Sequence, residues 1–225
     1  MIPILLEDNH LLALDKPAGL LAQGDATGDR SVVDLARADL KHRHNKPGNV
    51  YVGLVHRLDR PVSGVILLAK TSKAAARLSA QFRDREVEKL YLALVEGSPE
   101  EESGAWSDSL RKDEGTNRVH VVPDGSGDLA TLGYRVVGRS RGLSLVELRP
   151  TTGRGHQLRV QLASRGLPIV GDRKYGARSS LPAADGGYRI ALHAHGLGFN
   201  HPTRGEWVEL RSPLPSDWPQ SSPRP

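Results

Sequence analysis

Short apolar runs separated by turn residues constrain the fold of this chain more than any other feature of its sequence. Residues 10–15, 65–69 and 90–95 are dominated by Leu, Val, Ile and Ala, and each run is followed by charged residues, Gly or Pro. Short runs of this kind are typical of β-strands. Hydrophobic residues form 38% of the 225 residues, so the chain can bury a core and global disorder is excluded.

Apolar residues at helical spacing predict helices over residues 31–42, 72–85 and 156–165. Ser31 is suited to cap the first of these helices, with Asp34 at its third position. Further strands are expected over residues 131–137, 143–148, 190–194 and 207–210. Because strands outnumber helices and do not alternate with them regularly, we predict an α+β fold with a mixed, mainly antiparallel central sheet flanked by helices.

The remaining stretches are interpreted as connections. Residues 111–128 predict an irregular segment, such as a hairpin or a flap, and residues 172–187 predict a loop rich in Gly and Ala. The tail from Ser212 is rich in proline and is expected to be ordered only where it packs. No repeat or linker interrupts the chain, so we expect one domain with two lobes over residues 1–225.

The charge of the chain favours a polyanionic partner. The formal net charge is +5 and the pI is about 9.6, which attracts polyanions over long distances. Arg is far commoner than Lys. Arg makes bidentate contacts with phosphate, but an excess of Arg fits a genome rich in G and C equally well.

Other features of the composition exclude whole classes of protein. The chain has no cysteine, so disulfides, thiolate catalysis and Cys-ligated metal sites are excluded. The N-terminus does not have the pattern of a signal peptide, and no apolar run approaches the ~20 residues of a membrane span. We therefore expect a soluble cytoplasmic protein.

Residues 55–70, VHRLDRPVSGVILLAK, carry the strongest candidate for chemistry. They place one carboxylate, Asp59, in a loop among polar and basic residues, and Ser63 and Gly64 then lead into an apolar strand. A loop mounted on a rigid strand is a suitable support for a catalytic group. Taken alone, Asp59 followed by Arg60 fits a solvated surface pair better.

Residues 56–59, His-Arg-Leu-Asp, followed by Ser63 and Gly64, resemble the H-R-L-D-x-x-T-S-G signature of the RluA-type pseudouridine synthases. Further segments match motifs of that family in the family's order: residues 15–19 (DKPAG), 89–95 (KLYLALV), 153–160 (GRGHQLRV), 171–176 (GDRKYG), 192–194 (LHA) and 199–202 (FNHP). The resemblance covers about residues 8–214, which is nearly the whole chain. Each motif alone is weak, but accidental agreement of so many in one order is very improbable.

Three positions depart from the family's motifs. Val62 stands where the family usually has Thr, Gly155 replaces the Thr of G-R-T-H-Q, and Gln161 replaces a common His. Val62 loses a hydroxyl but keeps the β-branched shape, and Gly155 loses a possible hydrogen bond. Because the carboxylate of Asp59 is retained, the departures concern substrate affinity or loop order more than the class of reaction.

The resemblance implies the pseudouridine synthase fold, with two lobes around an RNA-binding cleft, and the isomerisation of uridine to pseudouridine in tRNA or ribosomal RNA. This reaction breaks the C1′–N1 bond, turns the base and joins C1′ to C5, without a metal or a cofactor. The resemblance identifies Asp59 as the catalytic carboxylate, which either attacks C1′ or takes a proton from C2′. The target base must leave the helical stack to be reached.

The resemblance also implies four substrate-binding residues. Arg159 would lower the pKa of Asp59 and orient it. Tyr91 would stack on the uracil, and Leu192 would pack beneath it. Arg57 would fill the vacated space or hold a phosphate. Without the resemblance, the two arginines would be interpreted as surface residues, and the tyrosine and the leucine as core residues.

The chain is expected to grip structured RNA with its catalytic domain alone. Many relatives carry an N-terminal RNA-binding module, whereas here the DKPAG motif already begins at Asp15. Candidate contacts are the basic residues within 41–46, 135–141 and 173–174, although each group also fits a solvated run of charge. An open cleft for RNA favours a monomer.

Two other classes of function fit parts of the sequence. An RNA-binding protein that has lost catalysis would explain Val62 and Gly155. It has no chemical need, however, for Asp59, Tyr91 and Arg159 together. A glycoside hydrolase would require a second catalytic carboxylate. The pattern His-x-His at residues 193–195, with His201 nearby in sequence, suggests zinc, but no third ligand has a recognisable spacing, so we expect no metal.

Overall fold

The computed structural model describes residues 1–182, 187–216 and 218. Residues 183–186 of the predicted loop 172–187 lie outside the described residues, as does most of the predicted tail beyond residue 216. No helix in the described part of the chain is long and apolar enough to cross a membrane.

The chain forms two compact units, and each is described here by itself. The first unit consists of Met1–Glu88 and Ala194–Pro213. The second consists of Lys89–His193 together with the described residues that follow Pro213. The expectation of one domain over the whole chain stays a prediction.

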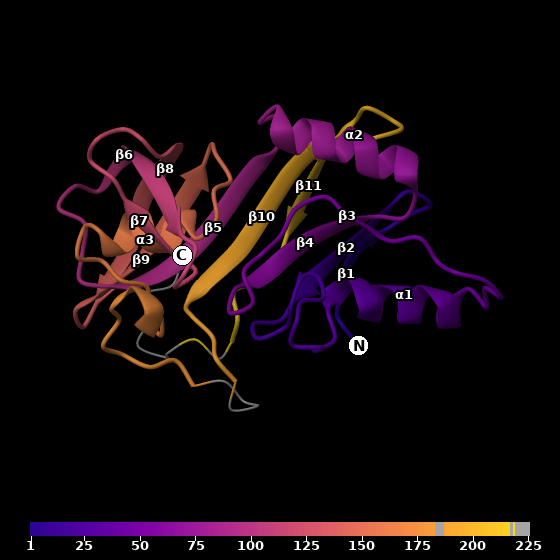
Figure 1. The fold of residues 1–225 in the computed structure, drawn as a ribbon, viewed down its shortest axis with the longest axis horizontal. Coiled ribbons are helices and arrows are strands. Elements are labelled where there is room, and N and C mark those ends of the chain that lie inside the picture. The colour runs from indigo at the N-terminus through magenta and orange to yellow at the C-terminus, as the bar shows by residue number, and fades with distance from the viewer. Residues whose placement is uncertain (183–186, 217, 219–225) are drawn as a thin grey trace. The chain divides into compact units, whose positions relative to one another are not determined.

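The first unit contains a mainly antiparallel sheet. Its strands lie in the order β1 (Ile4–Glu7), β2 (Leu11–Lys16), β4 (Ser63–Ala69) and β10 (Leu192–Asn200), as Figure 1 shows; β10 belongs to this unit from Ala194 onward. Two shorter strands, β3 (Gly53–Leu54) and β11 (Trp207–Arg211), pair with β4 and β10 respectively.

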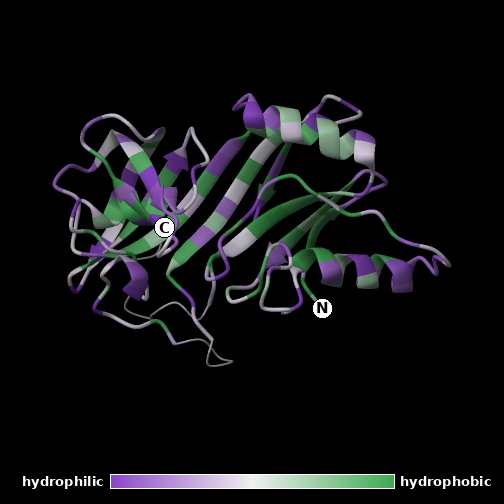
Figure 2. Cartoon of the chain, viewed as in Figure 1, coloured by the Kyte–Doolittle hydropathy of each residue, from purple (hydrophilic) through white to green (hydrophobic). Residues whose placement is uncertain are grey.

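Both faces of this sheet are covered, and every residue of β4 is therefore buried. On one face, α2 (Ser72–Arg83) packs Ala74 and Leu78 against side chains of β2, β4 and β10. Alternate residues such as Leu12 are equally buried on the other face, where Figure 1 draws α1 (Val32–Arg43). Figure 2 shows β2 and β4 as mostly hydrophobic and both helices as mixed, which is the pattern of strands enclosed between helices.

The predicted capping box of α1 is confirmed. The backbone N–H of Asp34 donates to Ser31 Oγ at 3.3 Å, and the backbone N–H of Ser31 donates to the Asp34 carboxylate at 3.1 Å. α2 begins in a similar way, because Thr71 Oγ1 accepts from the backbone N–H of Ala74 at 3.2 Å. In both helices the cap satisfies backbone donors that the helix itself leaves unpaired.

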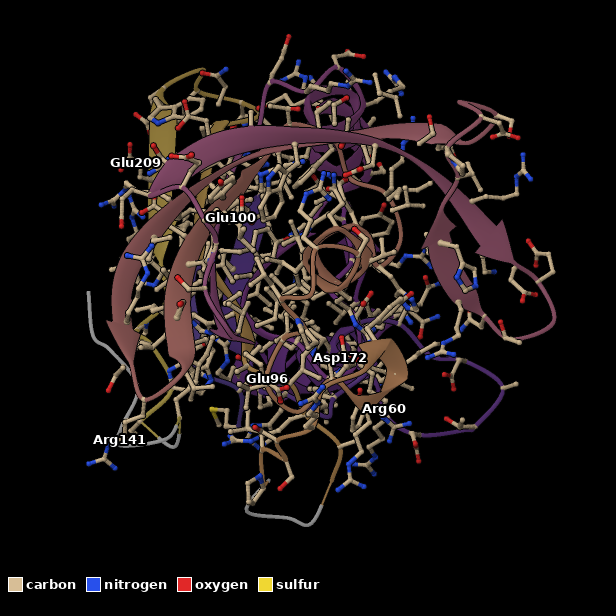
Figure 3. All side chains as sticks on the ribbon, turned by 90° about the vertical axis from the view of Figure 1, so that its left-hand side faces the viewer. Arg60, Glu96, Glu100, Arg141, Asp172 and Glu209 are labelled. Atoms are coloured by element: carbon tan, nitrogen blue, oxygen red, sulfur yellow. The ribbon has the colours of Figure 1, made fainter. Side chains whose placement is uncertain are left out.

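The second unit contains an antiparallel sheet with one helix packed against it. Its strands lie in the order β5 (Glu88–Glu96), β9 (Leu143–Pro150), β8 (Asp128–Ser140), β6 (Ser103–Asp113) and β7 (Arg118–Val121). Val160 of α3 (Gln157–Ala163) packs with side chains of β6, β7 and β8. A short 3₁₀-helix, η1 (Arg173–Tyr175), follows α3. In Figure 3 the strands of this unit arch around α3.

The α+β class and the mainly antiparallel pairing are confirmed, whereas several element bounds are corrected. β10 begins at Leu192 and extends to Asn200, where the sequence predicted a strand over residues 190–194. The glycines in its second half hid the rest of the strand. Over residues 111–128, where the sequence predicted a hairpin or a flap, the first part is the β6–β7 hairpin, which confirms the first of these forms there. β1 and β3 were not predicted at all.

Glu7 joins three elements of the first unit. Its carboxylate accepts from Lys70 Nζ at 2.7 Å and from Arg43 Nη2 at 2.8 Å, and His44 Nε2 lies 3.2 Å away. Lys70 follows β4, while the other two residues end α1. Burial alone would raise the pKa of Glu7, but the hydrogen bonds of these three residues outweigh burial and lower the pKa to about 2.

We predict that Glu7→Gln lowers the free energy of unfolding at neutral pH by on the order of 1–2 kcal/mol, allowing for screening by solvent. Because folding lowers the pKa of Glu7, its stabilising contribution is complete above about pH 4.5 and is lost as the pH falls toward 2. Urea unfolding at a series of pH values measures this difference, with Glu209→Gln, at an exposed position of β11, as the control. A difference that did not shrink below pH 4.5 would contradict the role of the ionised carboxylate.

Candidate active site

Asp59 lies on the loop between β3 and β4 of the first unit, and the backbone of this loop is fixed. The backbone N–H of Val62 donates to the carbonyl of Asp59 at 3.0 Å, which closes a tight turn. Leu58 and Val62, on the two sides of this turn, are both buried. The turn is therefore anchored in the core at both ends, while the Asp59 side chain remains partly exposed.

Lys16 supports this turn from its buried side. Its side chain is fully buried at the end of β2, and its ammonium donates to the carbonyls of Pro17 at 3.0 Å, Arg60 at 3.2 Å and Val62 at 2.7 Å. Burial lowers the pKa of Lys16 to about 7, and the negative charge of Asp59 acts in the opposite direction. The cation thus holds the backbone of the turn and lies within electrostatic reach of Asp59.

Contacts around the loop explain two further residues of the signature. His56 Nε2 accepts from the backbone N–H of Leu67 at 2.9 Å, and its ring stacks on Phe82 with centroids 4.7 Å apart. Gly64 has a φ of +112°, and a Cβ there would collide with the carbonyl oxygen of Ala194. His56 therefore fastens the loop to the sheet, and only glycine fits at position 64.

In the second unit, Arg159 of α3 forms a buried ion pair with Asp172. Arg159 Nε and Nη2 donate to the two carboxylate oxygens at 2.7 and 2.9 Å, and the side chains are 4% and 0% exposed. The guanidinium carbon also lies 5.0 Å from the centre of the Tyr175 ring. Asp172, which is labelled in Figure 3, directly precedes η1. The carboxylate on one edge and the ring on one face fix the guanidinium in a single orientation.

Two phenols extend this cluster. The Tyr175 hydroxyl accepts from the backbone N–H of Val119 at 3.0 Å and pairs with His156 Nδ1 at 2.8 Å. The Tyr188 hydroxyl donates to Asp172 Oδ1 at 3.1 Å. Burial, with the nearby charge of Asp172, raises the pKa of Tyr188 to about 12. Tyr188 therefore acts as a hydrogen-bond donor to the carboxylate throughout the neutral pH range.

The three departures from the family's motifs do not remove any of the contacts described above around Asp59 and Arg159. Gln161 is buried and donates to the Asp108 carboxylate at 2.6 Å. A Cβ at Gly155 would meet open space, so glycine is not required there by crowding. Val62 supports the loop through its backbone carbonyl, which accepts from Lys16, and this contact does not depend on the missing hydroxyl.

The structure places the five predicted site residues on four different elements. In the first unit, Arg57 is exposed and lies on the same loop as Asp59. In the second unit, Tyr91 is partly buried on β5, Arg159 is buried on α3, and Leu192 is buried at the first position of β10. The meeting of all five residues in one pocket stays a prediction.

Sequence reasoning assigned no role to several residues of these clusters, among them Lys16, Asp172 and Tyr188. Lys16 and Asp172 belong to the matched motifs DKPAG and GDRKYG. The motifs could therefore have pointed to both residues, but the sequence does not reveal the groups to which they form hydrogen bonds. Tyr188 belongs to no motif. Its hydrogen bond to Asp172 depends on how the chain folds back, which no local pattern reports.

Comparison with known proteins gives a consistent result. Residues 10–164 match the family described as RNA pseudouridylate synthase. The ribosomal large subunit pseudouridine synthase D of Zymomonas mobilis is 35% identical over 222 residues, covering 96% of this chain and 70% of that protein. Ribosomal large subunit pseudouridine synthase C of Vibrio parahaemolyticus is 34% identical over 215 residues, covering 95% and 66%. The chain thus spans about two thirds of the length of these relatives.

Two solved human structures share the fold. Human RNA Pseudouridylate Synthase Domain Containing 4 matches with a TM-score of 0.77 and 28% identity, covering 95% of this chain and 89% of that chain. Human RNA Pseudouridylate Synthase Domain Containing 1 matches with a TM-score of 0.73 and 26% identity, covering 97% and 88%. The pseudouridine synthase fold expected from the resemblance is confirmed, and the RNA-binding cleft between two lobes stays a prediction.

We predict that Lys16→Met lowers the free energy of unfolding by roughly 2–3 kcal/mol, because three backbone carbonyls lose their buried donor. Hydrogen exchange at the amide of Val62 should also become faster, since the turn loses its support. Lys73→Met, at an exposed position of α2, is the matched control. Unchanged stability and unchanged exchange in Lys16→Met would show that the ammonium does not hold the turn.

We predict that Asp172→Asn lowers the free energy of unfolding by about 3 kcal/mol, because it removes the buried negative charge that two hydrogen bonds join to Arg159. The control is Asp128→Asn, which removes an exposed ion pair to Arg154 with an N–O distance of 3.3 Å and should change stability by about 1 kcal/mol or less. Urea denaturation of both variants compares them. Equal effects at the two positions would argue against a special role for the buried pair.

Proposed function

Because the chain belongs to the RNA pseudouridylate synthase family, we propose that it isomerises specific uridines of structured RNA to pseudouridine, with ribosomal RNA as the substrate. The relatives are named as synthases of the ribosomal large subunit, which favours ribosomal RNA over tRNA. The reaction involves no change of redox state and no external energy source. The proposal therefore includes no cofactor, and it keeps the cytoplasmic location and the monomeric state that were expected from the sequence.

The observation that carries this proposal is the position of Asp59 on a turn that a buried ammonium holds. The carboxylate must be ionised, both to attack C1′ and to take the proton from C2′. The negative charge of Asp59 in turn acts against the lowering of the Lys16 pKa by burial, so the carboxylate favours the ammonium form that holds the turn. A fixed turn also keeps the carboxylate at one distance from the sugar, which reduces the entropy lost on reaching the transition state.

The proposal assigns to Arg159 the role of orienting Asp59. Asp172 occupies the edge of the guanidinium that carries Nε and Nη2. Asp172 thus fixes the orientation of the arginine, and the role proposed for Arg159, which follows from the family resemblance, is to hold the catalytic oxygen atoms by a charge-assisted hydrogen bond.

Three residues are proposed to hold the target nucleotide. Tyr91 stacks on the uracil, and Leu192 packs beneath it, because a flipped base needs apolar and aromatic surface to replace the helical stack. Arg57, which is exposed on the loop of Asp59, fills the vacated space in the RNA or holds a phosphate. Both roles of Arg57 use a cation that solvent and RNA can reach.

We predict that Asp59→Asn lowers pseudouridine formation by roughly 1000-fold or more, as expected for removal of an essential reacting group. Ribosomal RNA and tRNA from cells that lack the gene are mapped for missing pseudouridine, and rescue is attempted with the wild type and the variant. Asp84→Asn, at the exposed end of α2, serves as the control and should rescue fully.

The same experiment separates the proposal from its rival. Rescue by Asp59→Asn would contradict the catalytic role of the carboxylate. A wild-type protein that binds ribosomal RNA while every pseudouridine persists in the deleted strain would instead favour an RNA-binding protein without catalysis. If the deleted strain lacked a pseudouridine in tRNA only, the isomerase activity would be supported and the substrate would be tRNA instead of ribosomal RNA.

A further inference from the structure

Tyr188 is a half-exposed tyrosine whose hydroxyl is fixed. The residue is 47% exposed, yet its hydroxyl donates to Asp172 Oδ1 at 3.1 Å and accepts from the backbone N–H of Lys174. An exposed aromatic side chain normally loses rotational freedom when it binds a ligand. Here hydrogen bonds already hold the hydroxyl, so the half-exposed ring is restricted before any ligand binds.

The segment next to Tyr188 is rigid and positively charged. The Glu96 carboxylate, which is labelled in Figure 3, accepts from the backbone N–H groups of Arg178 at 2.9 Å and Ser179 at 2.6 Å. Ala177 N–H donates to the carbonyl of Asp172 at 3.1 Å, which fastens the same segment to η1. The side chains of Arg173 and Arg178 are exposed on this segment. Exposed aromatic rings and exposed cations on neighbouring segments are the combination by which proteins hold unpaired nucleotides.

We propose that Tyr188 is a stacking platform for an unpaired RNA base that neighbours the target uridine. This inference rests on the proposed function, because it takes Arg159 as the marker of the reaction site. Only Asp172 separates the two residues, since its carboxylate accepts from both Arg159 and Tyr188. When the target uridine leaves the stack, its neighbour loses one stacking partner, and the ring of Tyr188 replaces that partner.

If Tyr188 only held Asp172 in place and did not bind RNA, a different part of its side chain would be needed. Asp172 already accepts two hydrogen bonds from Arg159, and support from Tyr188 would depend on the hydroxyl alone. Stacking depends on the ring instead. Tyr188→Phe removes the hydroxyl and keeps the ring, whereas Tyr188→Leu removes both, so the pair of variants separates the two roles.

The test measures binding by fluorescence anisotropy with a labelled single-stranded oligoadenylate and with an abasic ribose-phosphate chain of equal length. Neither probe contains uridine, so the isomerisation does not take part. We expect Tyr188→Leu to weaken oligoadenylate binding by about 5- to 150-fold, the effect of losing one base–aromatic stack, and to leave binding of the abasic chain unchanged. Tyr188→Phe should stay within about threefold of the wild type on both probes.

Further variants keep the test decisive. Tyr51→Leu is the matched control, because Tyr51 is 49% exposed and its ring covers Gly53 rather than a buried ion pair; it should bind both probes as the wild type does. If Tyr188→Leu folds poorly, Tyr188→Trp provides a larger aromatic face and should bind oligoadenylate at least as tightly as the wild type.

The proposal is overturned if Tyr188→Leu binds oligoadenylate as the wild type does, if it loses affinity equally for both probes, or if Tyr188→Trp binds oligoadenylate more weakly than the wild type. The proposed isomerase fails by a separate result, namely a deleted strain that keeps all of its pseudouridines. The two failures are therefore distinguishable.

Discussion

The buried ammonium of Lys16 is the interaction on which the arrangement of the catalytic loop depends. Removing a charged side chain from water is unfavourable unless the interior supplies hydrogen bonds and opposite charge. Here three backbone carbonyls accept from Nζ, and the charge of Asp59 lies within reach. An apolar side chain at position 16 could fill the same volume, but the carbonyls that it left unbonded would no longer define a single conformation of the turn.

The second unit also contains a buried charged group that accepts or donates several hydrogen bonds, but here the charge is negative. Asp172 is fully buried, and its carboxylate receives hydrogen bonds from Arg159 and Tyr188. In each unit, a buried ion from one family motif holds groups that the proposed reaction requires. Such ions add little net stability compared with a well-packed apolar core. Their contribution is to orientation, which catalysis needs more than stability.

The sequence predicted those features that depend on local pattern. The capping box of Ser31 and Asp34 and the buried strand at residues 65–69 follow from side-chain chemistry within a few positions. The second half of β10 was not predicted, because its glycines have no strand preference and are stabilised by pairing with β11. Asp59 was found through its motif, whereas the partners of Lys16 lie 44 and 46 positions along the chain and no periodicity could reveal them.

Gly64 has a mechanical consequence for the loop that precedes it. Its backbone passes so close to the carbonyl of Ala194 that no side chain fits between the two segments, and its positive φ directs the chain from the loop into β4. The loop is therefore held in place where it enters the sheet. Because the backbones of Gly64 and Ala194 are in direct contact, a thermal displacement of β10 also displaces the end of the loop. Within the first unit, the loop therefore moves with the sheet as one rigid part and not as a flexible connection.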